Sequence, residues 1–219
     1  MTKTIIFILA IFLTVDCFCQ STEILESYSD TIELKKGGLF FIDLTRVKSE
    51  EHDGHLVRVT FTHDLGNGGT LLSSYDIDKD PLIGCEPKKY DYNGDGYLDY
   101  SFVSNMAARS ANEIRTIFIF DLNENRFLHI KNSEQYPNLI FNPKLNCLDA
   151  WAFHGGTIQS FLKLESDSLV LMYTIDIHGT ERVLGKYENG DQVSREVDTI
   201  QDVGFPRHIS FNPFEEYKN

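Results

Sequence analysis

The chain is constrained most by short apolar stretches that recur along its whole length. They are spaced about eight to twelve residues apart, with turn signals such as Gly66-Asn67-Gly68-Gly69 between them. In the stretch around Val57, Val59 and Phe61, apolar and polar residues alternate, which is the period of a half-buried strand. No segment of the mature chain shows sustained helical periodicity. The pattern predicts an all-β fold, either an antiparallel β-sandwich or a partly open barrel.

One stretch, Ile117-Phe118-Ile119-Phe120, is apolar at every position. A strand of this kind is expected to be central and buried on both faces. Repeats that would indicate a propeller or a solenoid are missing from the sequence. Residues 20–219 are therefore predicted to form a single β domain.

Residues 1–19 have the features of a cleaved signal peptide. Lys3 is positively charged, and the segment from Thr4 to Val15 is almost unbroken apolar but too short to span a bilayer comfortably. Cys17 and Cys19 are the small residues expected before the cleavage site. We therefore expect a periplasmic or secreted protein with no membrane span in the mature chain. An uncleaved anchor or a lipid-modified cysteine is the alternative.

The formal net charge of −13 argues against a nucleic-acid partner, because nothing in the sequence would neutralise phosphate. An acidic surface suits a basic protein partner, which it attracts over a distance. Solubility alone is the simpler interpretation of the same charge.

A nine-residue segment from Asp91 to Asp99 has the spacing of a cation-binding loop. Oxygen side chains stand at alternate positions, and Gly96 stands where such a loop turns sharply. The predicted ligands are the side-chain oxygens of Asp91, Asn93, Asp95 and Asp99 and the main-chain carbonyl of Tyr97. Calcium suits this set, because it accepts six to eight oxygens in loose geometry. The alternative is a turn rich in Gly and Asp that holds no metal.

The segments that flank this loop differ from the two helices of an EF-hand. The twelfth position, where such a hand places a bidentate Glu, is Phe102. The residues after the loop have the pattern of a strand. We therefore expect a structural calcium ion that stabilises a bend between two strands.

Two cysteines, Cys85 and Cys147, remain in the mature chain. In an oxidising compartment such a pair is a disulfide candidate, and a bridge across this long loop would contribute about 4 kcal/mol on the chain-entropy model. Two free buried thiols are the alternative.

Several motifs between residues 90 and 172 resemble those of a known family. The motifs are the Asp91–Asp99 loop, the strand pair around Phe118-Ile119-Phe120-Asp121 and Asn125-Arg126-Phe127, the break at Asn142-Pro143-Lys144, the segment Trp151-Ala152-Phe153-His154-Gly155-Gly156, and the strand pair through Lys163 and Leu169-Val170-Leu171. They resemble a family of bacterial periplasmic proteins with one cation loop of the FG-GAP kind. That family includes immunity proteins against secreted peptidoglycan hydrolases, and its fold is similar to that of the i-type lysozyme inhibitors.

The resemblance implies a calcium-stabilised β-sandwich that binds a hydrolase and blocks its cleft with protruding loops. It implies the ligand set given above and a hairpin shaped by Trp151 and by His154, Gly155 and Gly156. The polar segment from 105 to 112 is a second candidate binding loop, with Asn105 and Arg109 as its candidate contacts. Taken alone, Trp151 suits a core position and His154 a turn position.

An enzymatic function has little support in the sequence. His154, Asp149, His178 and Asp176 could serve as acid-base groups, but Gly-x-Ser-x-Gly and His-Glu-x-x-His motifs are absent. We therefore expect a binding protein without catalytic residues. A calcium-dependent surface or adhesion module and a carbohydrate-active enzyme remain as alternatives.

Overall fold

The computed structural model describes residues 23–33, 38–48, 55–64, 69–201 and 204–218. The described residues are almost entirely β-strands, joined by short turns and one 3₁₀ turn, η1 (Ser133–Gln135), and every pairing of neighbouring strands is antiparallel. The all-β prediction is confirmed. The predicted signal peptide, with Cys17 and Cys19, lies outside the described residues, as do most residues of the turn at 66–69. No helix in the described part of the chain has the length and apolar character to cross a membrane.

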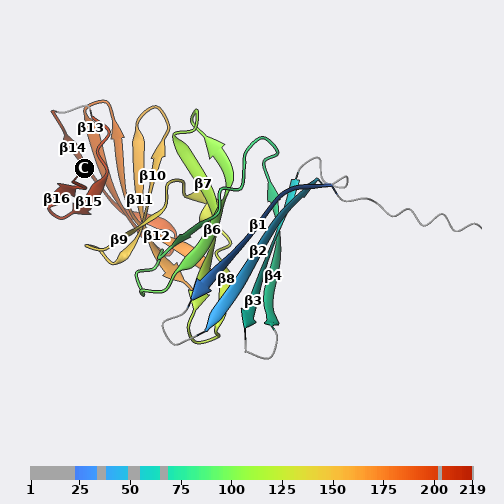
Figure 1. Cartoon of the computed structure of the whole chain (residues 1–219). Helices are drawn as coiled ribbons and strands as arrows, with labels where there is room; N and C mark the ends of the chain where they lie inside the picture. The colour runs from blue at the N-terminus through green and yellow to red at the C-terminus, as the bar shows by residue number, and fades with distance from the viewer. Residues whose placement is uncertain (1–22, 34–37, 49–54, 65–68, 202–203, 219) are drawn as a thin grey trace, which may run out of the picture.

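The strands form three large sheets that follow one another along the chain (Figure 1). The first sheet has the order β1-β2-β3-β4 and contains β1 (Ile24–Glu33), β2 (Leu39–Lys48), β3 (His55–Asp64) and β4 (Gly69–Lys79). The middle sheet has the order β5-β6-β7-β8 and contains β5 (Lys88–Tyr90), β6 (Asp99–Ala107), β7 (Asn112–Asp121) and β8 (Arg126–His129). Sequential strands are spatial neighbours in both sheets, as short hairpin connections require.

The third sheet has six strands in the order β14-β13-β12-β11-β10-β9. They are β9 (Ile140–Asn142), β10 (Cys147–Phe153), β11 (Thr157–Glu165), β12 (Ser168–His178), β13 (Glu181–Glu188) and β14 (Asp191–Thr199). A last hairpin of β15 (His208–Phe211) and β16 (Phe214–Glu216) follows. The sequence patterns predicted no strand in this C-terminal segment, because its few apolar residues stand among polar and charged ones.

The middle sheet lies between the other two, and β7 explains why. Phe118 and Phe120 point to one side and belong to a buried cluster shared with the first sheet. Ile117 and Ile119 point to the other side and belong to a cluster shared with the third sheet. Successive side chains of a strand alternate between the faces of its sheet, so a strand covered on both faces needs apolar residues throughout. The prediction of a central buried strand at 117–120 is confirmed.

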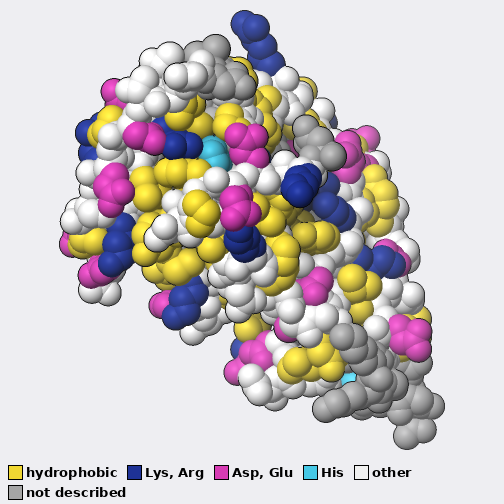
Figure 2. All heavy atoms as spheres, turned by 90° about the vertical axis from the view of Figure 1, so that its left-hand side faces the viewer, with side chains coloured by type: hydrophobic (Ala, Val, Ile, Leu, Met, Phe, Trp, Pro, Cys, Tyr) yellow, Lys and Arg dark blue, Asp and Glu magenta, His cyan; other side chains and the backbone are white. Residues whose placement is uncertain are grey.

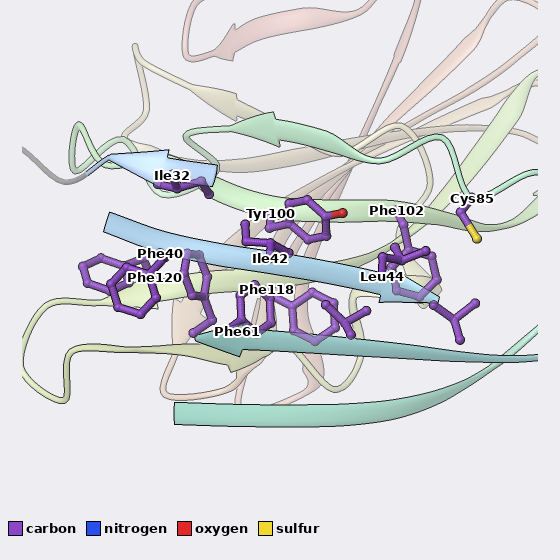
Figure 3. Close-up of a cluster of buried hydrophobic side chains, with 13 residues drawn as sticks. Ile32, Phe40, Ile42, Leu44, Phe61, Cys85, Tyr100, Phe102, Phe118 and Phe120 are labelled. Atoms are coloured by element: carbon purple, nitrogen blue, oxygen red, sulfur yellow. The ribbon is translucent and has the colours of Figure 1, made fainter. Parts of the chain in front are cut away.

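The core between the first and middle sheets is largely aromatic (Figure 3). Phe61 of β3 stacks on Phe127 of β8 with ring centroids 4.3 Å apart, and Phe40 of β2 meets Phe120 edge-on at 5.4 Å. Each fully buried Phe contributes roughly 2–3 kcal/mol through the surface it removes from water. Val57, Val59 and Phe61, which alternate in the sequence, are all fully buried here.

The outer face of the third sheet is covered by the C-terminal hairpin. Phe211 of β15 packs edge-on against Phe161 of β11, with centroids 5.1 Å apart, and also lies against Tyr173 of β12. Cys147, Ile175 and Ile177 are among the buried residues of this cluster. The hairpin therefore closes the apolar face that the middle sheet does not reach.

The predicted disulfide is absent from this structure. Cys85 and Cys147 are free, buried thiols. Cys85 lies in the cluster between the first and middle sheets, whereas Cys147 lies in the cluster on the outer face of the third sheet. The middle sheet lies between these two clusters, and a disulfide requires Cα atoms within about 7 Å.

Candidate functional site

The Asp91–Asp99 loop connects β5 to β6, and its side chains fold back over its own backbone. The two carboxylate oxygens of Asp91 accept hydrogen bonds from the backbone N–H groups of Gly94, at 2.7 Å, and Gly96, at 2.8 Å. Asp95 accepts from the backbone N–H of Tyr97 at 2.8 Å, and Asn93 accepts from that of Asp95 at 3.1 Å. These bonds tie the side chains of Asp91, Asn93 and Asp95 to the backbone of one tight loop.

Both glycines of this loop have left-handed backbones, with φ of +74° at Gly94 and +83° at Gly96. Gly94 also lies against the ring of Phe141 in β9, where an added Cβ would stand 2.1 Å from the ring carbon Cζ. Any other residue at position 94 would have a strained backbone, and its side chain would clash with the ring of Phe141. The loop is therefore packed tightly against the third sheet.

Asp99 differs from the other predicted ligands because its side chain is fully buried. One carboxylate oxygen accepts from the backbone N–H of Tyr92 at 2.7 Å and the other from that of Phe120 at 2.9 Å. Burial, with a smaller contribution from the nearby charges of Asp95 and Asp91, raises the pKa of Asp99 to about 8 against the opposing effect of the two backbone hydrogen bonds. Asp99 thus joins the loop, the start of β6 and the central strand β7.

The donor set of the loop is compatible with calcium, because all five predicted ligands are oxygens and three are carboxylates that repel one another. In the described part of the chain, however, no three His, Cys, Asp or Glu side chains are gathered closely enough to hold a metal ion. The amide oxygen of Asn93 and the main-chain carbonyl of Tyr97 are predicted ligands of other kinds. Calcium in this loop therefore stays a prediction.

The segment from 105 to 112, predicted as a binding loop, is partly strand. Strand β6 runs to Ala107 and β7 begins at Asn112, so Asn105 is an exposed strand residue at a β-bulge. The turn itself has left-handed backbones at three successive positions, Ala108, Arg109 and Ser110, with φ of 49°, 57° and 70°. Arg109 is exposed at this turn. The predicted loop is a narrow hairpin tip.

The other predicted binding segment, from Trp151 to Gly156, forms the β10–β11 hairpin. Trp151 lies in β10, and His154, Gly155 and Gly156 form the turn, which is closed by a hydrogen bond from the backbone N–H of His154 to the carbonyl of Gly156 at 3.1 Å. Gly155 is left-handed, with φ of +98°. An added Cβ at Gly156 would stand 2.1 Å from the carbonyl oxygen of Ile177, so only glycine fits there.

Two asparagines that the sequence patterns did not single out hold these hairpins side by side. The Asn112 side chain donates to the carbonyl of Phe153 at 3.0 Å and accepts from its N–H at 2.8 Å. The Asn138 side chain donates to the carbonyls of Ala111 and Trp151, both at 2.8 Å. In Figure 1 the tips of the β6–β7 and β10–β11 hairpins lie next to each other at the top of the view. We call this pair of tips the hairpin end.

The hairpin end and the cation loop lie at opposite ends of β6. The loop precedes Asp99, and the β6–β7 tip follows Ala107. The eight steps between the nine residues of β6 span about 26 Å at roughly 3.3 Å each. A cation in the loop could therefore support the scaffold without touching a partner bound at the hairpin end.

Of the four residues considered as acid-base groups, the structure brings one pair together. Nε2 of His154 lies 3.4 Å from Oδ1 of Asp176, and both side chains are about two-fifths exposed. Asp149 lies elsewhere, fully buried against Arg207. His178 lies near Gly156 and lines a small cavity of about 220 Å³ with Asp176.

These features define an all-β protein in which stacked sheets present two hairpins that are joined by side-chain hydrogen bonds. No family model matches the chain, and no curated protein matches it. A solved structure described as that of a Xanthomonas type IV secretion system related protein is similar over 89% of this chain and 100% of that chain. Its identity is 14% and its TM-score 0.40, a likeness too weak to support an argument about function.

Proposed function

We propose that the protein is a calcium-stabilised periplasmic or secreted binding protein that inhibits a lysozyme-like peptidoglycan hydrolase by steric blockade. The observation that carries the proposal is the hairpin end, where two tips are held side by side by the amides of Asn112 and Asn138. The motif resemblance between residues 90 and 172 supplies the class of partner.

Rigidity is the physical reason why such an end suits inhibition. A loop that is ordered before binding loses little conformational entropy when it enters a cleft. The backbones of Ala108, Arg109 and Ser110 are held in the left-handed region, a conformation that costs free energy and persists only where the surroundings enforce it. The net charge of −13 would attract a hydrolase with a basic rim.

Calcium would be held by Asp91, Asn93, Asp95, the carbonyl of Tyr97 and Asp99. Its charge would offset the repulsion among the three carboxylates. The loop packs on Phe141 of β9, and Asp99 bonds to the backbone of β7. The ion would therefore stabilise the junction of the middle and third sheets, and no step of blockade requires it to touch the hydrolase.

The test is the lytic activity of a panel of lysozymes and lytic transglycosylases, with and without the mature protein. Inhibition of at least one enzyme at micromolar excess is expected, and no inhibition across the panel would count against the proposal. The variant Arg109→Ala/His154→Ala changes exposed residues of both tips and should weaken inhibition at least tenfold. Arg126→Ala, which alters an exposed arginine in the β7–β8 hairpin, is the matched control.

The same preparation separates the alternatives. Hydrolysis of a glycan substrate by the protein alone would favour a carbohydrate-active enzyme and would direct attention to the pair His154 and Asp176. Binding to cell surfaces with calcium but without inhibition would favour an adhesion module.

A further inference from the structure

One arginine differs from all the others in the chain. The eight arginines lie within the described residues, and seven of them have a side-chain nitrogen within 3.5 Å of a carboxylate oxygen. Arg109 is the exception, since among the described residues it has no ion pair, hydrogen bond or ring contact. Acidic residues outnumber Lys and Arg by 33 to 20, so a shortage of carboxylates is not the reason.

Arg109 lies at the tip of the β6–β7 hairpin, which is one half of the hairpin end. The turn consists of residues 108–111 and is closed by a hydrogen bond from the backbone N–H of Ala111 to the carbonyl of Ala108 at 3.2 Å. All four residues are exposed. The other three are two alanines and a serine, so Arg109 supplies the only long side chain of a narrow tip.

The backbone of this turn restricts where Arg109 can lie. Ala108, Arg109 and Ser110 all have left-handed backbones, a region that glycine adopts without steric cost and that other residues adopt only where the surroundings enforce it. The hydrogen bonds between Asn112 and the backbone of Phe153 hold the base of the turn against β10. A turn without glycine has fewer backbone conformations open to it, so Arg109 meets a partner from an ordered tip.

The charge of the hairpin end differs from that of the acidic protein as a whole. Neither the segment 105–112 nor the segment 151–157 contains Asp or Glu, and Asp176, which reaches this end, lies against His154. Figure 2 keeps the vertical direction of Figure 1 and shows many Lys and Arg side chains beside Asp or Glu. A Lys or Arg side chain projects alone from the upper edge, the end of the molecule at which the hairpin end lies in Figure 1.

We infer that Arg109 enters the active-site cleft of the hydrolase and pairs with its catalytic carboxyl groups. The inference rests on the proposed function and names the contact that produces the blockade. Glycoside hydrolases cleave with two Asp or Glu residues about 5–10 Å apart, so the floor of their cleft is acidic even where its rim is basic. A guanidinium presents five donors in a planar fork that matches a carboxylate. The narrow tip carries that fork past the rim.

The test measures the Kd for an enzyme that the protein inhibits in the lytic panel, by isothermal titration calorimetry. Arg109→Ala should raise the Kd about thirtyfold or more, because a central arginine removed from water is among the costliest residues to truncate in an interface. Arg109→Lys keeps the charge but not the fork, and should recover part of the loss. Arg58→Ala removes the same charge from an exposed arginine of the first sheet and should change the Kd less than about threefold.

A second comparison identifies the group with which Arg109 pairs. Each catalytic carboxyl group of the enzyme is replaced in turn by the corresponding amide, and the wild type and Arg109→Ala are titrated against both enzyme variants. For at least one of them, Arg109→Ala should change the Kd less than about threefold, because the partner of the guanidinium is already gone. The melting midpoint of Arg109→Ala should match that of the wild type, since the side chain is exposed and has no contact to lose.

Two results would overturn the inference and leave the proposed function standing. One is that Arg109→Ala inhibits an enzyme of the panel as strongly as the wild type does. The other is that Arg109→Ala weakens binding equally to the unmodified enzyme and to both amide variants, which would place Arg109 on the rim of the cleft. If no enzyme of the panel is inhibited, the proposed function and the inference fail together.

Discussion

Replacement of Arg207 by Met should destabilise the protein strongly. Nε of Arg207 donates to the carboxylate of Asp149 at 2.7 Å, and Nη2 pairs with the same group. Nη2 also donates to the backbone carbonyls of Asn138 and Asp149, both at 2.9 Å. The Asp149 side chain has no exposed surface. Arg207→Met therefore leaves a buried carboxylate without its cation, while Met keeps much of the apolar stem.

The expected loss is about 3–5 kcal/mol at neutral pH, the usual result of breaking one side of a buried ion pair. For a chain of this size that lowers the melting midpoint by about 6–20 °C. Tyr217 and Asn142 still donate to Asp149, at 2.6 and 3.2 Å, which keeps the loss near this range. Because Arg207 also bonds to Asn138, the variant should loosen the hairpin end as well.

The pH dependence gives the sharper test. Burial already raises the pKa of Asp149 in the wild type, against the opposing effect of Arg207, and removal of Arg207 raises it further. A group whose folded pKa is raised stabilises the fold at low pH and loses that contribution as pH rises through the folded pKa. The gap in unfolding free energy between wild type and variant should therefore be larger at about pH 8 than at about pH 5.

Urea unfolding at both pH values measures this gap. The double variant Asp149→Asn/Arg207→Met should recover part of the loss, because the neutral amide can still accept from Tyr217. Arg126→Met is the control, since its ion pair with Glu124 is about half exposed and contributes less than about 1 kcal/mol. A fall in midpoint below about 2 °C for Arg207→Met, or a gap that does not change with pH, would refute the reasoning.

Three further predictions concern the cation loop, the thiols and His208. Millimolar calcium should raise the melting midpoint relative to chelator, and Asp95→Ala should remove the difference; an unchanged wild-type midpoint would exclude the ion. The chain without residues 1–19 should show two titratable thiols when denatured and almost none when folded, because burial raises the pKa of both Cys85 and Cys147 to about 12. A denatured chain without free thiols would instead indicate a disulfide between them. His208 has a folded pKa of about 4, below its unfolded value, so the unfolded state alone takes up a proton as pH falls from about 6.5 to 4. About 3 kcal/mol of stability should be lost in that window, and His208→Phe should lack this part of the slope; an equal slope in both proteins would contradict it.

Local patterns predicted the elements well where one face of a strand is buried. Val57, Val59 and Phe61 could be assigned to a core face because their alternation matches the pleat of a strand. The continuous apolar run at 117–120 could be assigned to a central strand for the related reason that both of its faces are covered. The C-terminal strands were missed, because β15 and β16 have only four and three residues and too few alternations to stand out.

The candidate sites were predictable only in part. The oxygen donors of the Asp91–Asp99 loop follow from spacing within nine residues, and the glycines there follow from the turn they must make. The hairpin end was predicted as two separate segments. Its pairing depends on Asn112 and Asn138, and an asparagine near a turn is too common to indicate a long-range contact.

The sequence by itself determined the strand class, the central strand and the type of ligand that the cation loop could offer, because these depend on neighbours a few residues apart. The tertiary structure alone decided which sheets stack, that Cys85 and Cys147 lie in different clusters, and that Arg207 reaches Asp149 across 58 residues. Such contacts are made by common polar or small residues whose partners are brought near only when the sheets pack. Their stabilising effect arises from burial, which no local pattern encodes.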